Sequence, residues 1–229
     1  MEMVQTADFW IDLFKIIWIN IILSGDNAVV IAMAARSLPP HHQRAAVLWG
    51  SGFAVVLLVA LTVVAAKLLG LPYLQIAGGL MLLWIGVQLL GEDDEGDEGG
   101  EVKHHGTVLA AVRTIVVADL IMSLDNVIAV AAAAEGKILL LILGLAISIP
   151  VVVFGSTLMI KLMERFPIIV VLGAGLVGWV GGETIVADAV LKNALAASRW
   201  IHYAGAIAGA VIVVGVGKVR QARERMKTA

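Results

Sequence analysis

The sequence predicts an all-α membrane protein with seven transmembrane helices, arranged as two inverted three-helix repeats and one C-terminal helix. Its 229 residues are 60% hydrophobic and only 15% charged, a balance typical of membrane rather than globular proteins. Seven apolar runs have the length of about 18 residues or more that a spanning helix needs. A polar motif that occurs twice, once in each half of the chain, indicates the repeat.

The apolar runs favour helices because membrane β-strands would alternate apolar and polar residues, and these runs do not. The first run would form a helix about 40 Å long, more than the hydrocarbon core of about 30 Å. We expect it to break at Ser24–Asn27, where glycine weakens a helix and Ser and Asn side chains compete for backbone hydrogen bonds. The expected helices lie at roughly 9–35, 45–66, 72–90, 107–134, 138–160, 166–187 and 201–217.

The repeated motif reads Ser-x-Asp-Asn, with a further polar residue four positions before the serine. Its two copies are Asn20/Ser24/Asp26/Asn27 and, ninety-nine residues later, Asp119/Ser123/Asp125/Asn126. A charged side chain at a bilayer centre costs about 2.5–3.5 kcal/mol on insertion scales, so a bound cation is the expected compensation. The alternative is that these side chains only hydrogen-bond between helices as packing contacts.

Other residues follow the same repeat. Pro72, Trp84 and Gly86 each have an identical residue ninety-five positions later. Because each repeat has three helices, the second copy enters the membrane from the opposite side, and the halves become inverted repeats. We therefore expect Asp26 and Asp125 on interrupted helices at the repeat interface. The predicted regions are 1–90, an acidic His-containing cytoplasmic linker at 91–106, 107–190, and 191–229 with the seventh helix and a basic tail.

The two motifs predict a cation site built from oxygen atoms. Carboxylate, amide and hydroxyl oxygens suit Mn²⁺, Mg²⁺ or Ca²⁺ better than Zn²⁺ or Cu⁺. Glu183 is a candidate as a further acid or proton acceptor, whereas Asp188, near the outer end of its span, is expected to be solvated. The candidate metal ligands are Asp26, Asp125, Asp119, Asn27, Asn126, Asn20, Ser24, Ser123 and Glu183.

Several function classes lack their sequence signatures. There is no cysteine, and no nucleophile constellation, phosphate-binding glycine loop or basic nucleic-acid patch, so we expect neither an enzyme nor a tightly bound cofactor. The basic residues give the orientation: eleven lie on one side of the predicted membrane and five on the other. This places the N-terminus outside and the C-terminus in the cytoplasm, with the basic tail close to anionic lipid.

The doubled motif, the three-plus-three helices and the charged middle loop resemble the TerC family of integral membrane proteins, within the lysine-exporter superfamily. The resemblance implies export of Mn²⁺ from the cytoplasm across the bacterial inner membrane, and proton exchange is a hypothesis for its coupling. In many relatives an acid stands six residues before the motif aspartate. Asp119 fits that pattern and Asn20 departs from it.

Two other functions stay open at this stage. The protein could be a membrane partner that transports nothing and supplies metal to the secretion machinery or scaffolds it. Export of amino acids, as in distant superfamily members, would require a cavity lined for a zwitterion, and the density of acids argues against it. Transport measurements in vesicles separate these possibilities.

Overall fold

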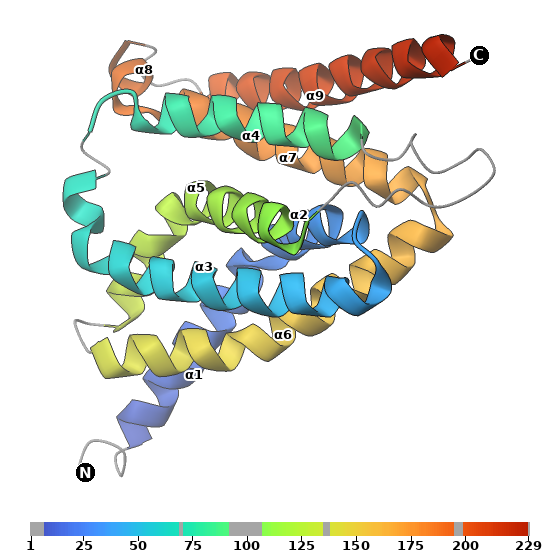
Figure 1. The fold of residues 1–229 in the computed structure, drawn as a ribbon. Helices are drawn as coiled ribbons and strands as arrows, with labels where there is room; N and C mark the ends of the chain where they lie inside the picture. Colours follow the sequence, from blue (N-terminus) through green and yellow to red (C-terminus); the bar gives the residue numbers. More distant parts are fainter. Residues whose placement is uncertain (1–6, 69–70, 92–106, 135–137, 195–198, 229) are drawn as a thin grey trace.

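The computed structural model describes residues 7–68, 71–91, 107–134, 138–194 and 199–228, and within these ranges every regular element is a helix. Figure 1 shows their arrangement. The bounds are α1 Ala7–Leu23, α2 Gly25–Arg36, α3 Pro40–Leu68, α4 Leu74–Gly91, α5 Val108–Ala134, α6 Ile138–Arg165, α7 Ile168–Ala187, α8 Ala189–Ala194 and α9 Arg199–Thr228.

The predicted membrane class is confirmed. Within the described ranges, five helices are long and apolar enough to cross a bilayer, and these are α3, α4, α6, α7 and α9. Large apolar side chains such as Trp84 (64% exposed) and Phe154 (72%) lie on the outside of the protein, as lipid contact requires and as soluble monomers rarely show over wide areas. The other two predicted spans, 9–35 and 107–134, are those that carry the motifs.

The predicted break in the first run is confirmed, but only one of the two motifs interrupts its helix. Helix α1 ends at Leu23 and α2 begins at Gly25, with Ser24 between them. Helix α5, in contrast, runs without interruption through the second motif, so the expectation of an interrupted helix at Asp125 is wrong. The residue inside the motif explains the difference, because Gly25 is replaced by Leu124, and leucine is a far stronger helix former than glycine.

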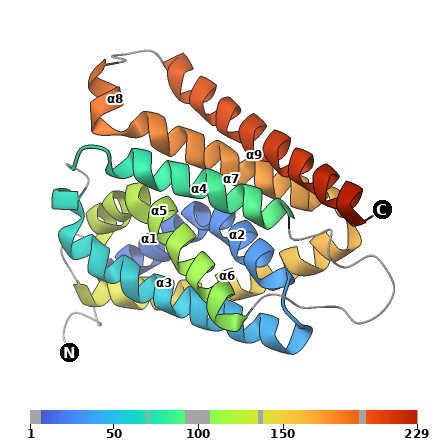
Figure 2. The same ribbon diagram turned by 45° about the horizontal axis from the view of Figure 1, so that its top comes forward.

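Helices of one half of the chain pack mainly on helices of the other half. Helix α3 packs on α5, α6 packs on both α1 and α2, and α4 packs on α7, which is covered by α9. Figures 1 and 2 show α4, α7 and α9 as one layer beside the group formed by α1, α2, α3, α5 and α6. Helix α1 begins at one end of the molecule, and α9 ends at the other.

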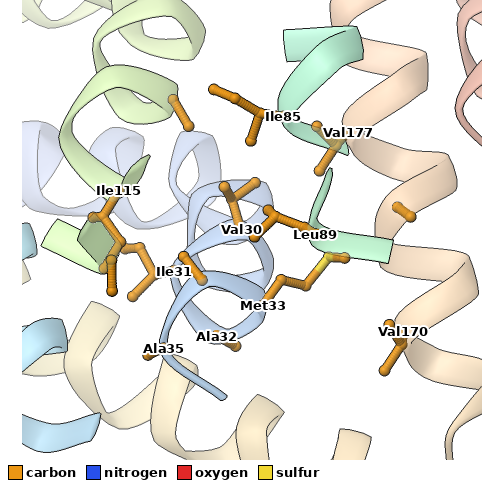
Figure 3. Close-up of a cluster of buried hydrophobic side chains, with 14 of the residues drawn as sticks. Val30, Ile31, Ala32, Met33, Ala35, Ile85, Leu89, Ile115, Val170 and Val177 are labelled. Carbon is orange, nitrogen blue, oxygen red and sulfur yellow. The ribbon is translucent and has the colours of Figure 1, made fainter. Parts of the chain in front are cut away.

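Helix α2 lies at the centre of the hydrophobic core. Its side chains Ala32, Met33 and Ala35 are fully buried, and Figure 3 shows them between Leu89 of α4 and Ile115 of α5. A short helix that is apolar on all sides is expected only where other helices surround it. The core therefore fixes α2, and with it the first motif at its N-terminal end.

Helices α4 and α7 approach each other through glycine at Gly79 and Gly181. A Cβ atom at Gly79 would lie 2.5 Å from the carbonyl oxygen of Gly181, which leaves no room for any side chain. Small residues at such positions let membrane helices pack closely. The contact joins the third helices of the two predicted repeats.

Asp188 is not solvated, and that expectation is wrong. It is fully buried directly after α7 and accepts backbone N–H groups of Tyr73, Gln75 and Ile76, at the start of α4, and of Val190. Burial acts to raise the pKa of the Asp188 carboxyl, but the four N–H donors outweigh it, so the pKa lies below its ordinary value. Asp188 thus supplies the hydrogen-bond acceptors that the first turn of α4 lacks.

The opposite end of α4 is capped by two other helices. Arg36 at the end of α2 donates to the Leu89 carbonyl (2.9 Å), and Gln221 of α9 donates to the Leu90 carbonyl (2.7 Å). These bonds satisfy carbonyls that have no partner within the helix. Gly91 ends α4, and the rest of the predicted linker at 91–106 lies outside the described residues.

Candidate functional site

The two motifs meet in a hydrogen bond between Asn27 and Asp119. The Nδ2 of Asn27 on α2 donates to Oδ1 of Asp119 on α5 at 2.7 Å, and the hydroxyl of Ser123 donates to Oδ2 of Asp119 at 3.4 Å. Each oxygen of this carboxylate is therefore bound by a different half of the chain. The pairing joins residues 92 positions apart.

The helix break places Asn27 at this point. Because α2 starts anew at Gly25, Asn27 lies in its first turn, where it is 4% exposed. Asp26 lies in the same turn, where an acid is favoured by the partial positive charge of a helix N-terminus. Its Oδ1 accepts the backbone N–H of Asn27 at 2.9 Å.

A cavity of about 30 Å³ lies beside the Asn27–Asp119 bond, with room for a water molecule or an ion of similar size. Helices α2, α3, α5 and α6 line it, so both halves contribute. One side is polar and the other is apolar. Its lining residues are Ser24, Asn27, Ser51, Asp119, Ser123 and Ser148 on the polar side, and Ile31, Ala54, Val55, Leu58, Ile149 and Val152 on the apolar side.

Two oxygen atoms at this cavity are buried without a hydrogen-bond partner. They are Oδ1 of Asn27 and Oγ of Ser51. The orientation of the Asn27 amide follows from its partner, because a carboxylate accepts hydrogen bonds and so the amide nitrogen must face Asp119. An unsatisfied buried polar group costs about 1–3 kcal/mol, so a ligand that binds both oxygens would recover that free energy.

The charge of the cavity lining favours a cation. Among the described residues that line it, Asp119 is the one acid, and none is Lys, Arg or His. Within the described part of the chain, no three His, Asp or Glu side chains gather as a metal-binding group. The arrangement can therefore offer one carboxylate together with neutral amide and hydroxyl oxygens.

The structure brings together four of the predicted site residues, namely Ser24, Asn27, Asp119 and Ser123. Asp26 is half-buried and does not line the cavity, and Glu183 is exposed on α7. The predicted ligands Asn20, Asp125 and Asn126 have side chains that lie outside the described residues.

Two cavity residues escaped the sequence prediction, and they are Ser51 on α3 and Ser148 on α6. Serine is common in membrane helices, where its hydroxyl usually bonds the carbonyl four residues earlier, so neither residue stands out in the sequence. A usable signal exists in the repeat, because the two serines are ninety-seven positions apart, close to the offset between the two motifs.

Comparison with known proteins gives matches over most of the chain. Residues 5–225 match the integral membrane protein TerC family. The uncharacterized membrane protein YjbE of Bacillus subtilis is 45% identical over 81% of this chain and 84% of its own length. The inner membrane protein YgdQ of Escherichia coli K12 is 24% identical over 69% of this chain and 73% of its own. No solved structure matches.

Proposed function

Because the chain belongs to the TerC family of integral membrane proteins, we propose that it is a transporter that exports divalent cations, Mn²⁺ first, from the cytoplasm. The observation that carries the proposal is the cavity in which Asn27 of one motif meets Asp119 of the other. A carboxylate enclosed by apolar helices needs a compensating charge. The small volume, and the carboxylate, amide and hydroxyl oxygens on the polar side of the cavity, suit a hard, partly dehydrated cation.

The choice of Mn²⁺ over softer metals follows from the donor atoms. No cysteine exists in the chain, and none of the described residues that line the cavity is His or Met, so the ligands that select Zn²⁺ or Cu⁺ are not found among them. Asp119 is the proposed charged ligand, with Asn27, Ser24 and Ser123 around it. Asp26 and Asp125 complete the proposed ion path, one from each motif.

We propose seven spans in two inverted repeats, with α1 and α2 together forming the first span and α5 the fourth. The exchange of helix partners supports this arrangement. The second helix of each half packs on the first span of the other half, and the third helices pack on each other, as a two-fold axis in the membrane plane requires. The cavity then lies at the repeat interface.

The proposed orientation has the C-terminus in the cytoplasm of a bacterial inner membrane. Helices α2 and α6 end at Arg36 and Arg165, on the side of the molecule where α9 also ends (Figure 1), and basic residues accumulate on the cytoplasmic side of membrane proteins. Ions would leave toward the end at which α1 begins.

Proton exchange is the proposed source of energy. The carboxylate of Asp119 can hold either a cation or a proton, and neutral oxygens alone could not make this exchange. A proton entering from outside would then displace the ion, and the proton would be released to the cytoplasm when the next ion binds. Exchange of this kind makes transport depend on a pH difference across the membrane.

Transport in liposomes tests the proposal. We expect purified protein to move Mn²⁺ across the membrane, and to move it faster when a pH gradient drives protons in the opposite direction. Asp119→Asn should reduce the Mn²⁺ flux at least tenfold. Glu164→Gln, which removes an exposed carboxylate at the end of α6, is the matched control and should behave as wild type. If the wild-type protein moves no divalent cation, a scaffold or metal-supply role replaces the proposal.

A further inference from the structure

The hydroxyl of Ser51 differs from four other buried or half-buried hydroxyls of the described helices, which bond their own helix. Ser148, Ser156, Thr157 and Thr184 each donate to the carbonyl four residues earlier, at 2.7–2.9 Å. Ser51 lies inside α3, where the carbonyl of Val47 offers the same bond, yet its Oγ has no hydrogen-bond partner. The side chain is 4% exposed, so bulk water does not supply one.

This hydroxyl lines the same cavity as the other unpaired oxygen, Oδ1 of Asn27. The amide nitrogen of Asn27 is already used on Asp119, so the amide offers only an acceptor to the cavity. A ligand that binds this acceptor and the Asp119 carboxylate must be a cation or a hydrogen-bond donor, because an anion would face lone pairs from both. The charge of the carboxylate favours the cation.

The surroundings of Ser51 favour direct contact with the ion. The next two turns of α3 contribute Ala54, Val55 and Leu58 to the cavity wall, and these apolar side chains offer no hydrogen bonds to a full water shell. An ion that enters this space must replace lost water oxygens with protein oxygens. Ser51 is the unpaired donor atom that α3 provides.

We propose that Ser51 is a direct ligand of the transported cation, and that α3 thereby takes part in the binding site together with the two motif helices. The inference rests on the proposed function of the cavity as a cation site. It adds a neutral hydroxyl ligand from outside the repeated motif. Ser51 then contributes to the preference for hard cations, since its oxygen is a poor ligand for soft ones.

Substitution of Ser51 by cysteine tests direct ligation. The wild-type chain has no cysteine, so the new thiol is unique and its chemistry can be followed without background. If Ser51 contacts the ion, Ser51→Cys should gain affinity for Cd²⁺ and lose affinity for Mn²⁺, because sulfur favours softer metals. Bound Cd²⁺ should also produce the ultraviolet absorption of a cadmium–thiolate bond and protect the thiol from alkylation.

Substitution of Ser51 by alanine is the second test of direct ligation. Equilibrium binding of Mn²⁺ to the purified full chain should weaken about tenfold, as loss of a group in a metal's ligand environment typically does. Ser156→Ala is the matched control, because Ser156 is equally buried on α6, bonds its own helix and does not line the cavity. Its affinity should equal that of wild type.

The outcomes separate the two proposals. Unchanged Mn²⁺ binding in Ser51→Ala, or a Ser51→Cys protein with no gain for Cd²⁺ and no thiolate absorption, overturns the role of Ser51. Should Ser51→Ala fail to fold, the cysteine variant decides alone, because a thiol is close in size to a hydroxyl. Absence of transport despite Ser51-dependent binding contradicts the transport function and leaves the ligand assignment intact.

Discussion

Oδ2 of Asp188 accepts the backbone N–H of Gln75 at 3.1 Å, across 113 residues of sequence. Three more N–H groups bind the same carboxylate, so the end of α7 holds the start of α4. Tyr73, beside this site, has a φ of 67°, a conformation that is unusual for a bulky residue. The carboxylate stabilises that turn by accepting the Tyr73 N–H.

Replacement of Asp188 by asparagine should therefore lower stability. The amide offers one acceptor oxygen in place of two and turns an NH₂ donor toward backbone donors, which leaves buried N–H groups unpaired. We expect the melting temperature in detergent to fall by roughly 3–8 °C. Glu164→Gln, at an exposed carboxylate, should have the melting temperature of the wild type. Equal melting temperatures of Asp188→Asn and Glu164→Gln would show that the Asp188 hydrogen bonds do not contribute to stability.

The same carboxylate predicts a pH dependence of stability. Because the pKa of Asp188 is lowered in the folded protein, its contribution is complete above the ordinary carboxyl pKa of 3.8 and is lost as pH falls through the lower folded value. Wild-type stability should drop in that acidic range more than the stability of Asp188→Asn. Parallel pH profiles of the two proteins would contradict this.

Close helix packing at Gly79 gives a steric prediction. In Gly79→Ala the new methyl group would press on the Gly181 carbonyl at 2.5 Å, so α4 and α7 must separate, and overpacking of this kind costs about 1–3 kcal/mol. Gly215→Ala on α9 is the control, because a Cβ atom there meets nothing within 4 Å. The yield and melting temperature of the folded protein should fall only for Gly79→Ala.

The main features of the fold could be predicted from the sequence because hydropathy and the break at Ser24 act locally. The bonds of Asp188 could not, since their donors come from a turn far away in the chain, and the position of the residue at a span end indicated contact with water. Leu124 could have predicted the uninterrupted α5, because leucine takes the place of the helix-weakening Gly25. The expectation of a break came from the other residues that the two motifs share.

The candidate site was predictable where both halves share the motif. Asn27, Asp119 and Ser123 were expected to converge, and hydrogen bonds join them. Which atoms pair was not predictable, because on a helix Asp26 and Asn27 lie only about 100° apart, and the core around α2 decides which of them faces the cavity. The repeat offset between Ser51 and Ser148 could have indicated Ser51, but the property that sets it apart, a missing hydrogen bond, is visible only in the structure.

A second carboxylate in the cavity should make the fold dependent on cations. Asn27→Asp replaces the hydrogen bond to Asp119 by repulsion between like charges, so the protein should melt earlier than wild type without metal. Added Mn²⁺ should then raise the melting temperature more than it does for wild type, because the ion stabilises the folded state that binds it. Gln88→Glu, which adds the same charge at an exposed position of α4, should show no such gain. An equal response of both variants would argue against a cation site.

The proposed orientation can be read from single cysteines in the naturally cysteine-free chain. His42 at the start of α3 and Leu71 before α4 are both exposed, and α3 separates them by one predicted span. In intact inner-membrane vesicles of known sidedness, a membrane-impermeant thiol reagent should label His42→Cys only from the cytoplasmic side and Leu71→Cys only from the outer side. The reverse pattern would invert the assignment of the C-terminus.

The location of a bound ion tests the central claim most directly. Crystals of the full chain soaked with Mn²⁺ should give an anomalous scattering peak inside the cavity, about 2.0–2.6 Å from oxygens of Asp119 and of Asn27, and the peak should vanish in Asp119→Asn. A cavity that stays empty at saturating Mn²⁺, or ions bound only away from Asn27 and Asp119, would contradict the account that the two motifs form one cation site.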